Sequence, residues 1–182
     1  MSEEEANLVR RAKAGDEDAF AELYQRYHPK IYRYVFFRVP AEAVAEDITA
    51  EVFVRLVEHI DDFSYRGRPL LAWLYTIARN LVADYHRRRG RSELVPLNER
   101  LISDSDAGNP VRNAEVSLLQ DRMAVALDRL TEDQRQVVIL RFFEEMDIRS
   151  VAELLGKTVG AVKALQHRAL NALYRIFTEN GT

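Results

Sequence analysis

The sequence has no cysteine among its 182 residues. Disulfides, thiolate metal sites and cysteine nucleophiles are therefore excluded. It also has no apolar run near the roughly 20 residues that a membrane-spanning helix needs. The N-terminus lacks the basic and then apolar layout of a signal peptide. These absences predict a cytoplasmic protein with no membrane insertion.

Patterns typical of enzymes are also missing. The histidines are scattered without metal-ligand spacing, at His28, His59, His86 and His167. No glycine-rich phosphate-binding loop is present. The adjacent acids Asp61 and Asp62 lie beside an expected loop, where capping or solvation is the simpler interpretation. We therefore expect no catalytic residue, no metal and no cofactor, and an enzyme ranks third among the functions considered.

Charge is segregated along the chain. Residues 1–64 carry 14 acids and 8 bases, whereas residues 65–91 carry 7 arginines and 1 acid. Residues 92–116 are acidic again, with 5 acids and 2 bases, and residues 117–182 hold 9 of each. A chain divided in this way is expected to meet more than one partner surface.

Apolar residues recur at spacings of three and four, and no stretch alternates as a β-strand would. This pattern predicts helices over residues 4–14, 17–39, 43–60, 70–89, 116–129, 134–143, 148–155 and 159–177. Pro29 is expected to kink or restart the second of these. Asp16 and Asp147 are expected to cap the helices that follow them, and Thr131 with Gln134 fits a capping box. The buried stripe of the helix over 43–60 is expected to contain Val44, Ile48, Val52, Phe53, Leu56 and Val57, and the helix over 134–143 is expected to bury Val137, Val138, Leu140 and Phe143. The fold class is therefore all-α. Two small helical domains, 1–91 and 117–182, are expected to be joined by a flexible acidic linker over residues 92–116, which is rich in turn-forming residues.

Residues 63–91 predict a short loop that runs into a helix with a basic end. Pro69 suits a first helical position, since its missing N–H costs nothing there. Trp73 falls within the apolar pattern and is expected to be largely core, whereas Phe63 and Tyr65 precede it and are expected to be exposed. Exposed rings beside arginines suit single-stranded nucleic acid, because unstacked bases need flat faces and phosphates need cations. The alternative interpretation is an ordinary core followed by a solvated helix end.

Residues 148–165 fit a helix-turn-helix. The small Ala152 allows two helices to approach, Gly156 makes the turn, and Val162 packs the second helix on the first. The second helix of this motif enters the DNA major groove. The residues expected to face the DNA are those on the outward side of this helix and the basic residues next to them: Lys157, Thr158, Val159, Gly160, Lys163, Ala164, His167 and Arg168. No acid interrupts residues 154–177, which favours DNA contact over a chance helical hairpin.

These segments resemble the bacterial sigma-70 family, in its small two-domain extracytoplasmic-function (ECF) group. Residues 45–53, AEDITAEVF, resemble the segment that binds core RNA polymerase in that family's first domain. Residues 63–89 resemble its minus-ten recognition and melting segment. Residues 130–141 and 151–170 resemble its second domain, which binds the minus-thirty-five element. The resemblance implies a sigma region 2 helical bundle followed by a sigma region 4 helix-turn-helix.

The resemblance also implies roles for individual residues. Asp47, Glu51 and Arg55 would face the polymerase clamp, although a solvated helix face is the simpler interpretation of each. The segment that captures an unstacked minus-ten base and its phosphates would contain Phe63, Tyr65, Arg66, Arg68, Arg79, Asn80, Arg87, Arg88 and Arg89. The implied partners are core RNA polymerase (clamp and flap), duplex and single-stranded promoter DNA, and an anti-sigma factor. The acidic linker would occupy a basic channel of the polymerase in place of RNA.

Two functions from different classes remain. The first is a sigma factor, which has no chemistry of its own and acts only with core polymerase. The alternative is a stand-alone helix-turn-helix transcriptional regulator with a helical sensor domain. It explains residues 117–177 equally well, but it gives no role to the aromatic and arginine stretch or to the acidic linker. Specific binding to duplex DNA without polymerase would favour the regulator.

Overall fold

The structure is a computed structural model that describes residues 3–65, 69–89 and 122–179. Every regular element within these ranges is helical, which confirms the all-α prediction. The chain divides into two compact units, Met1–Pro96 and Leu97–Thr182. The predicted linker over 92–116 lies outside the described residues, so its boundaries and its role remain predictions. Every helix in the described ranges is too short or too polar to span a bilayer.

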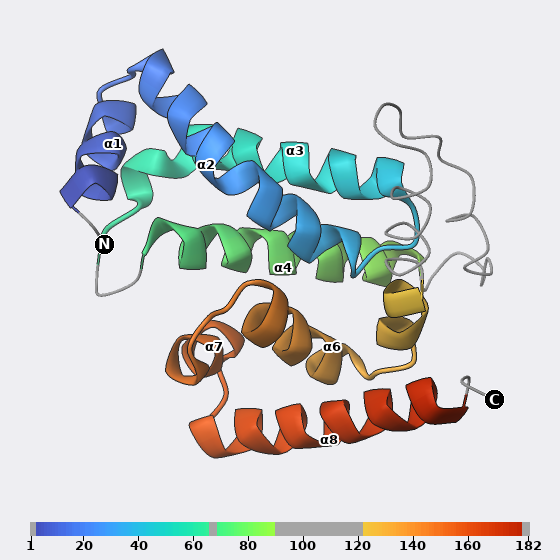
Figure 1. Cartoon of the computed structure of the whole chain (residues 1–182). Helices are drawn as coiled ribbons and strands as arrows, with labels where there is room; N and C mark the ends of the chain where they lie inside the picture. The colour runs from blue at the N-terminus through green and yellow to red at the C-terminus, as the bar shows by residue number, and fades with distance from the viewer. Residues whose placement is uncertain (1–2, 66–68, 90–121, 180–182) are drawn as a thin grey trace, which may run out of the picture. The chain divides into compact units, whose positions relative to one another are not determined.

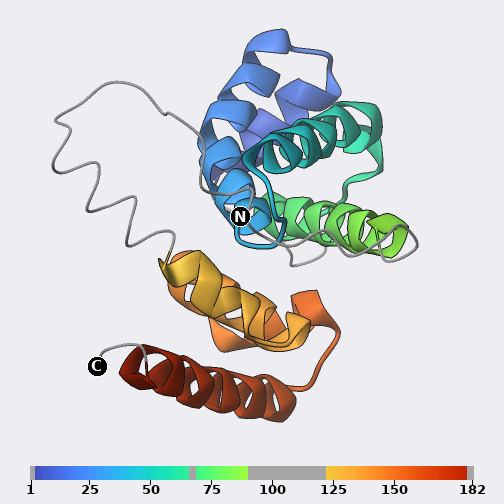
Figure 2. The same ribbon diagram turned by 90° about the vertical axis from the view of Figure 1, so that its right-hand side faces the viewer.

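The described residues of the first unit form four α-helices, labelled in Figure 1, and one short 3-10 turn. They are α1 (Glu3–Lys13), α2 (Glu17–Phe36), α3 (Glu42–His59), η1 (Ile60–Asp62) and α4 (Leu70–Arg89). Helices α2, α3 and α4 pack pairwise against one another, and α1 packs against α2 and η1. Figure 2 shows the three long helices around a shared interior. Side chains in this core that are no more than 1% exposed include Leu23, Ile31, Tyr34, Val52, Leu56, Leu70, Leu74 and Tyr75. Their burial stabilises the bundle, at roughly 1.5–3 kcal/mol for each large apolar side chain.

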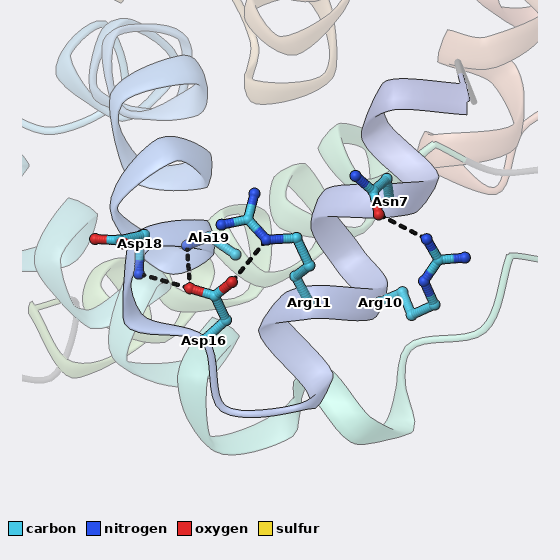
Figure 3. A network of polar contacts seen from close by, with 6 residues as sticks. All are labelled: Asn7, Arg10, Arg11, Asp16, Asp18 and Ala19. Atoms are coloured by element: carbon cyan, nitrogen blue, oxygen red, sulfur yellow. Dashed lines mark hydrogen bonds and ion pairs between the residues drawn. The ribbon is translucent and has the colours of Figure 1, made fainter.

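The corner between α1 and α2 is fixed by Asp16 (Figure 3). As predicted, Asp16 caps α2: its Oδ1 accepts the backbone N–H groups of Asp18 (3.0 Å) and Ala19 (3.2 Å). Nε of Arg11 donates to Oδ2 of the same carboxylate at 2.6 Å. The hydrogen bond from Arg11, followed by that from Ala19, lowers the pKa of Asp16. One side chain therefore begins α2 and ties it to the end of α1.

In the first unit, the expected burial of Val57 is wrong, and of the two outcomes expected at Pro29 the restart is contradicted. Pro29 does not restart the chain, because α2 continues through it to Phe36. Ile31, Tyr34 and Val35, which follow it in α2, are fully buried, and this packing offsets the backbone hydrogen bond that proline removes. Val57 was expected in the buried stripe of α3 but is 55% exposed. The stripe consists instead of Ala45, Thr49, Val52, Phe53 and Leu56.

The second unit is built from short helices followed by one long helix. Residues 122–128 are helical, and they are followed by α6 (Glu132–Val138), the π-turn η3 (Ile139–Phe143), α7 (Ile148–Leu155) and α8 (Val159–Glu179). The predicted capping box at Thr131 is confirmed. Its Oγ1 accepts the N–H of Gln134 (3.4 Å), and Oε1 of Gln134 accepts the N–H of Thr131 (3.1 Å). The buried core includes Leu127, Val137, Ile139, Leu140, Val151, Val162 and Ala169.

The π-turn η3 is a departure from the predicted regular helix. The Glu144 N–H donates to the carbonyl oxygen of Ile139 at 3.0 Å, five positions back rather than four. A wide turn of this kind holds more residues than an α-turn and shifts the side chains that follow. Phe143, which was expected to be buried, is accordingly only half-buried, and Phe142 is 48% exposed.

Candidate nucleic-acid interface

The connection between η1 and α4, residues 63–69, carries the aromatic side chains predicted to be exposed. Tyr65 is 48% exposed, as expected. The expectation for Phe63 is wrong: the side chain is 6% exposed, and its ring centroid lies 5.4 Å from that of Trp73. The Phe63 N–H donates to the carbonyl oxygen of Ile60 (3.1 Å), so the chain is still turning at this position, and the ring packs on α4. Arg66 and Arg68 lie outside the described residues.

Helix α4 presents polar residues along its outer side. Asn80, Arg87 and Arg88 are exposed, while Arg79 and Arg89 are half-buried. Asn80 and Arg87 are seven positions apart and therefore share one face, separated by about 10 Å along the axis. Arg87 forms an ion pair with Asp84, which neutralises part of the basic run. The helix thus offers an amide and a cation on one face, as the sequence predicts for a base edge and a phosphate.

The backbone around this connection is held by residues that sequence reasoning missed. Nζ of Lys13 donates to the carbonyl oxygens of Asp61 (3.0 Å) and Phe63 (2.6 Å). The Glu5 carboxylate accepts the N–H of Leu70 (3.2 Å), the first residue of α4. These contacts span 48, 50 and 65 positions. No periodicity or capping rule covers such distances, so the sequence carried no signal for them.

The outer face of α3 mixes charge with apolar surface. Asp47 is exposed, whereas Glu51 and Arg55 are half-buried and pair with each other, with Nε donating to Oε1 at 2.9 Å. Val54 and Val57 are 48% and 55% exposed on the same helix. Exposed apolar side chains beside charged ones are typical of surfaces that dock against another protein. The structure therefore adds two valines to a face that the sequence described by its charges alone.

The helix-turn-helix has the geometry that the sequence predicts. Asp147 caps α7, and its Oδ1 accepts the N–H groups of Arg149 (2.9 Å) and Ser150 (3.1 Å). Gly156 ends α7 in the left-handed region at φ 64°. Oγ1 of Thr158 accepts the N–H of Ala161 (3.1 Å) and begins α8. Val162 is fully buried and Ala152 is 4% exposed, as close packing of the two helices requires.

The outward side of α8 is exposed as expected, with two exceptions. The exposed residues are Thr158, Gly160, Lys163, Ala164, His167 and Arg168. Val159 is half-buried, and so is Lys157, whose Nζ donates to Oδ2 of Asp133 in α6 at 2.9 Å. Lys157 therefore contributes to the packing of the unit as well as to its surface charge. Lys163 is the cation that the first turns of α8 present to solvent.

Comparison with known proteins finds similarity along nearly the whole chain. The family model "Sigma-70 region 2" matches residues 23–92, and "Sigma-70, region 4" matches residues 120–173. The ECF RNA polymerase sigma factor BldN of Streptomyces coelicolor is 41% identical over 174 residues, 95% of this chain and 66% of BldN. The ECF sigma factor SigD of Mycobacterium tuberculosis is 36% identical over 173 residues, 91% of this chain and 80% of SigD. The chain therefore spans about two thirds of the length of BldN.

A solved structure agrees with the sequence matches. The sigma factor RpoE of Bartonella quintana, in complex with the anti-sigma factor NepR, is 26% identical to this chain with a TM-score of 0.71. The match covers 87% of this chain and 96% of the other. Helix α1 precedes the residues that the region 2 model matches.

Proposed function

This chain belongs to the sigma-70 family, in its extracytoplasmic-function group, and on that premise we propose how its residues direct transcription initiation. The chain binds core RNA polymerase, recognises the minus-ten and minus-thirty-five elements of promoters, and promotes melting at the first. The observation that supports this proposal is that the first unit exposes Tyr65 and Asn80, while the second unit contains a helix-turn-helix that exposes Lys163. A stand-alone regulator would need the helix-turn-helix but would leave the connection around Tyr65 without a role.

The first unit opens the minus-ten element by capturing an unstacked base. Flipping a nucleotide costs a few kcal/mol, while stacking one base on an aromatic side chain contributes ~1–3 kcal/mol. Tyr65 supplies the ring, and Asn80 supplies an amide for a base edge. The arginines of the basic run contact the backbone phosphates, together with Arg66, Arg68 and Arg79. Phe63 takes no part in this capture, because its ring is packed against Trp73.

The second unit reads the minus-thirty-five element through the major groove. The first turns of α8 present Thr158, Gly160 and Lys163, followed one turn later by His167. Lys163 can donate to a guanine edge or to a phosphate, and Arg168 lies where a phosphate would be met. Small residues at Gly160 and Ala164 allow the helix backbone to approach the base edges.

The remaining partners follow from the same role. Asp47, with the exposed valines of α3, docks against the polymerase clamp, and the second unit docks against the flap. An anti-sigma factor is a further partner, by analogy with the RpoE complex with NepR. The chain needs no cofactor and catalyses no reaction of its own. Its work takes place in the cytoplasm, where polymerase and promoters meet.

Promoter binding with and without core polymerase tests this proposal. The purified full-length chain is mixed with a promoter library, alone or with core polymerase, and footprints are mapped. We expect sequence-specific footprints over both elements only when core polymerase is present. Lys163→Ala should weaken protection of the upstream element and leave polymerase binding intact. Specific footprints from the chain alone would support the stand-alone regulator instead.

A further inference from the structure

Helix α1 contacts both ends of the connection that carries Tyr65. At one end, the Lys13 ammonium donates to the carbonyl oxygens of Asp61 and Phe63, where the chain leaves η1. At the other end, the Glu5 carboxylate accepts the N–H of Leu70, where α4 begins. The two described ends of the connection are therefore both anchored by a single helix.

The charges of the two anchors suit the helix ends that they meet. The end of α3 and η1 exposes backbone carbonyls with partial negative charge, which favour the Lys13 cation. The start of α4 exposes N–H groups with partial positive charge, which favour the Glu5 anion. Pro69 has no side-chain oxygen that could cap α4 locally, so Glu5 provides the cap from a distant helix. At both ends, the side-chain charge is opposite to the partial charge of the helix end that it meets. This complementarity favours a specific structural role for the two contacts over incidental contact.

Glu5 is buried within a small polar cluster. Its side chain is 7% exposed, and Oε1 accepts the Tyr27 hydroxyl (2.8 Å) in addition to the Leu70 N–H. Burial, and then the hydrogen bond to Glu5, raises the pKa of Tyr27 well above its usual value. Tyr27 therefore stays a neutral donor and holds the carboxylate in place.

Helix α1 is itself held firmly on α2. Arg11 bonds to Asp16 at 2.6 Å (Figure 3), and Nη2 of Arg26 donates to Oε1 of Glu4 at 2.6 Å. These pairs lie toward opposite ends of α1. A helix fixed in this way can set the position of the connection, rather than follow its movements.

We propose that α1 is a positioning element, in which Lys13 and Glu5 hold the connection so that Tyr65 is placed to receive an unstacked base. This inference rests on the proposed role of Tyr65 in single-strand capture. Fixing both ends before binding reduces the conformational entropy lost when the strand is captured. Lys13 and Glu5 touch no nucleic acid in this scheme; they act through the connection.

Lys13→Ala in the full-length chain tests the proposal, because Lys13 is exposed and its loss leaves the core intact. Arg10→Ala is the matched control: it removes the same charge from the same helix, but the Arg10 side chain bonds to Asn7 within α1. The measurement is the affinity of the variant, assembled with core polymerase, for a single-stranded minus-ten oligonucleotide. We expect about tenfold weaker binding for Lys13→Ala, since it removes a charged hydrogen-bond donor. Arg10→Ala and Lys13→Arg should bind like the wild type.

Two further measurements distinguish a loss of positioning from a general loss of structure in the variant. Trp73 is the single tryptophan of the chain and lies against Phe63, so its fluorescence in the free chain reports on the start of the connection. Lys13→Ala should shift this emission, and Arg10→Ala should not. The affinity loss should also disappear in a Tyr65→Ala background, because residues that act as one unit are not additive. Glu5→Gln tests the other anchor while keeping an oxygen for the buried donors, and we expect a smaller loss of affinity.

Three other results would overturn the positioning role of Lys13, and one of them would also overturn the capture role of Tyr65. If Lys13→Ala binds like the wild type while Tyr65→Ala binds weakly, the positioning role is overturned and the capture role of Tyr65 stands. A Lys13→Ala defect of full size in the Tyr65→Ala background also overturns it, since Lys13 would then act elsewhere. If Tyr65→Ala has no effect, the proposed function of the connection falls, and the positioning role falls with it.

Discussion

The two surfaces assigned to promoter DNA are assembled in opposite ways. In the helix-turn-helix, the bonds that shape the turn join near neighbours, such as Asp147 to Ser150 and Thr158 to Ala161. Around Tyr65, the bonds that shape the connection come from α1, 48 to 65 positions away. The first surface is a regular helix, which we propose reads an intact duplex. The second surface includes Tyr65, which lies outside the helices, and we propose that the backbone beside it must be braced before it can hold a base.

This difference matches what each surface is proposed to bind. A duplex presents its base edges at fixed spacings, so a helix with side chains on one face suffices. An unstacked base has no fixed position until it is bound, and the protein must supply the geometry. The first unit should therefore be more sensitive to substitutions far from the nucleic acid than the second unit. The following predictions test that contrast, from the largest expected effect to the smallest.

Phe63→Ala should have the largest effect on stability. The ring is buried against Trp73, and removing a buried phenylalanine ring costs about 3 kcal/mol or more. Urea unfolding of the full-length chain, followed by Trp73 fluorescence, measures the loss. Tyr65→Ala, two positions along, is the control and should change the free energy of unfolding by about 0.5 kcal/mol or less. Equal losses for the two variants would contradict the division between packed and exposed rings.

Tyr65→Ala combined with Asn80→Ala should reduce open-complex formation roughly tenfold or more, because a stacked base contributes ~1–3 kcal/mol. Permanganate reactivity of promoter thymines measures strand opening in the complex with core polymerase. A template that is already melted across the minus-ten element should restore part of the activity, since the opening cost has been removed. Polymerase binding should be unchanged. Normal reactivity on the duplex template would show that these residues do not drive melting.

Gly156→Ala should destabilise the second unit by about 1 kcal/mol, the cost of a left-handed conformation for a residue with a Cβ. The cost is purely one of backbone conformation, because an added Cβ would have no atom within 4 Å. Gly160→Ala is a control of opposite sign: Gly160 is helical, and alanine is favoured over glycine there by up to about 1 kcal/mol. Thermal unfolding of the two variants decides the matter. A stabilising Gly156→Ala would show that the turn is not held as described.

The smallest effect concerns acid stability at the Asp147 cap. The hydrogen bonds from the Ser150 hydroxyl and then from the Ser150 N–H lower the pKa of Asp147 below its usual value. Its contribution to stability is therefore complete above the unfolded pKa, near 4, and is lost as the pH falls through the lower folded pKa. Asp147→Asn keeps a good cap and should lose this part of the acid sensitivity. Melting temperatures of both proteins from pH 6 to about pH 3 measure their difference in stability, which should be constant above about pH 4 and change only below it, as the wild type loses its charged cap. A constant difference across that range would contradict the linkage.

The same contrast explains which features could be predicted from the sequence. Caps at Asp16, Thr131 and Asp147 follow rules that span three residues, and all are confirmed. The turn at Gly156 and the buried Val162 follow from spacing within one motif. The helix-turn-helix could therefore be predicted almost residue by residue, although the roles of its outward side chains remain predictions.

Errors arose where tertiary contacts override a local pattern. Phe63 lies outside the apolar period of α4, yet it packs on Trp73 of that helix because the preceding turn directs it inward. Val57 continues an apolar period, but no neighbouring helix covers enough of it to prevent 55% exposure. Lys13 and Glu5 look like ordinary surface charges in a short amphipathic helix. Their partners include backbone groups on other elements, and a sequence pattern does not record backbone partners.

The wide turn η3 bears on how the length of this region can vary. An ordinary α-turn at Ile139–Phe143 would need one residue fewer to reach the same point in space. The π-turn therefore accommodates one extra residue between two well-packed helices. We expect deletion of the exposed Phe142 to tighten the π-turn into an α-turn while leaving α7 and α8 in their present packing. In an alignment, a one-residue gap at this place would thus mark a change of helix pitch rather than a change of fold.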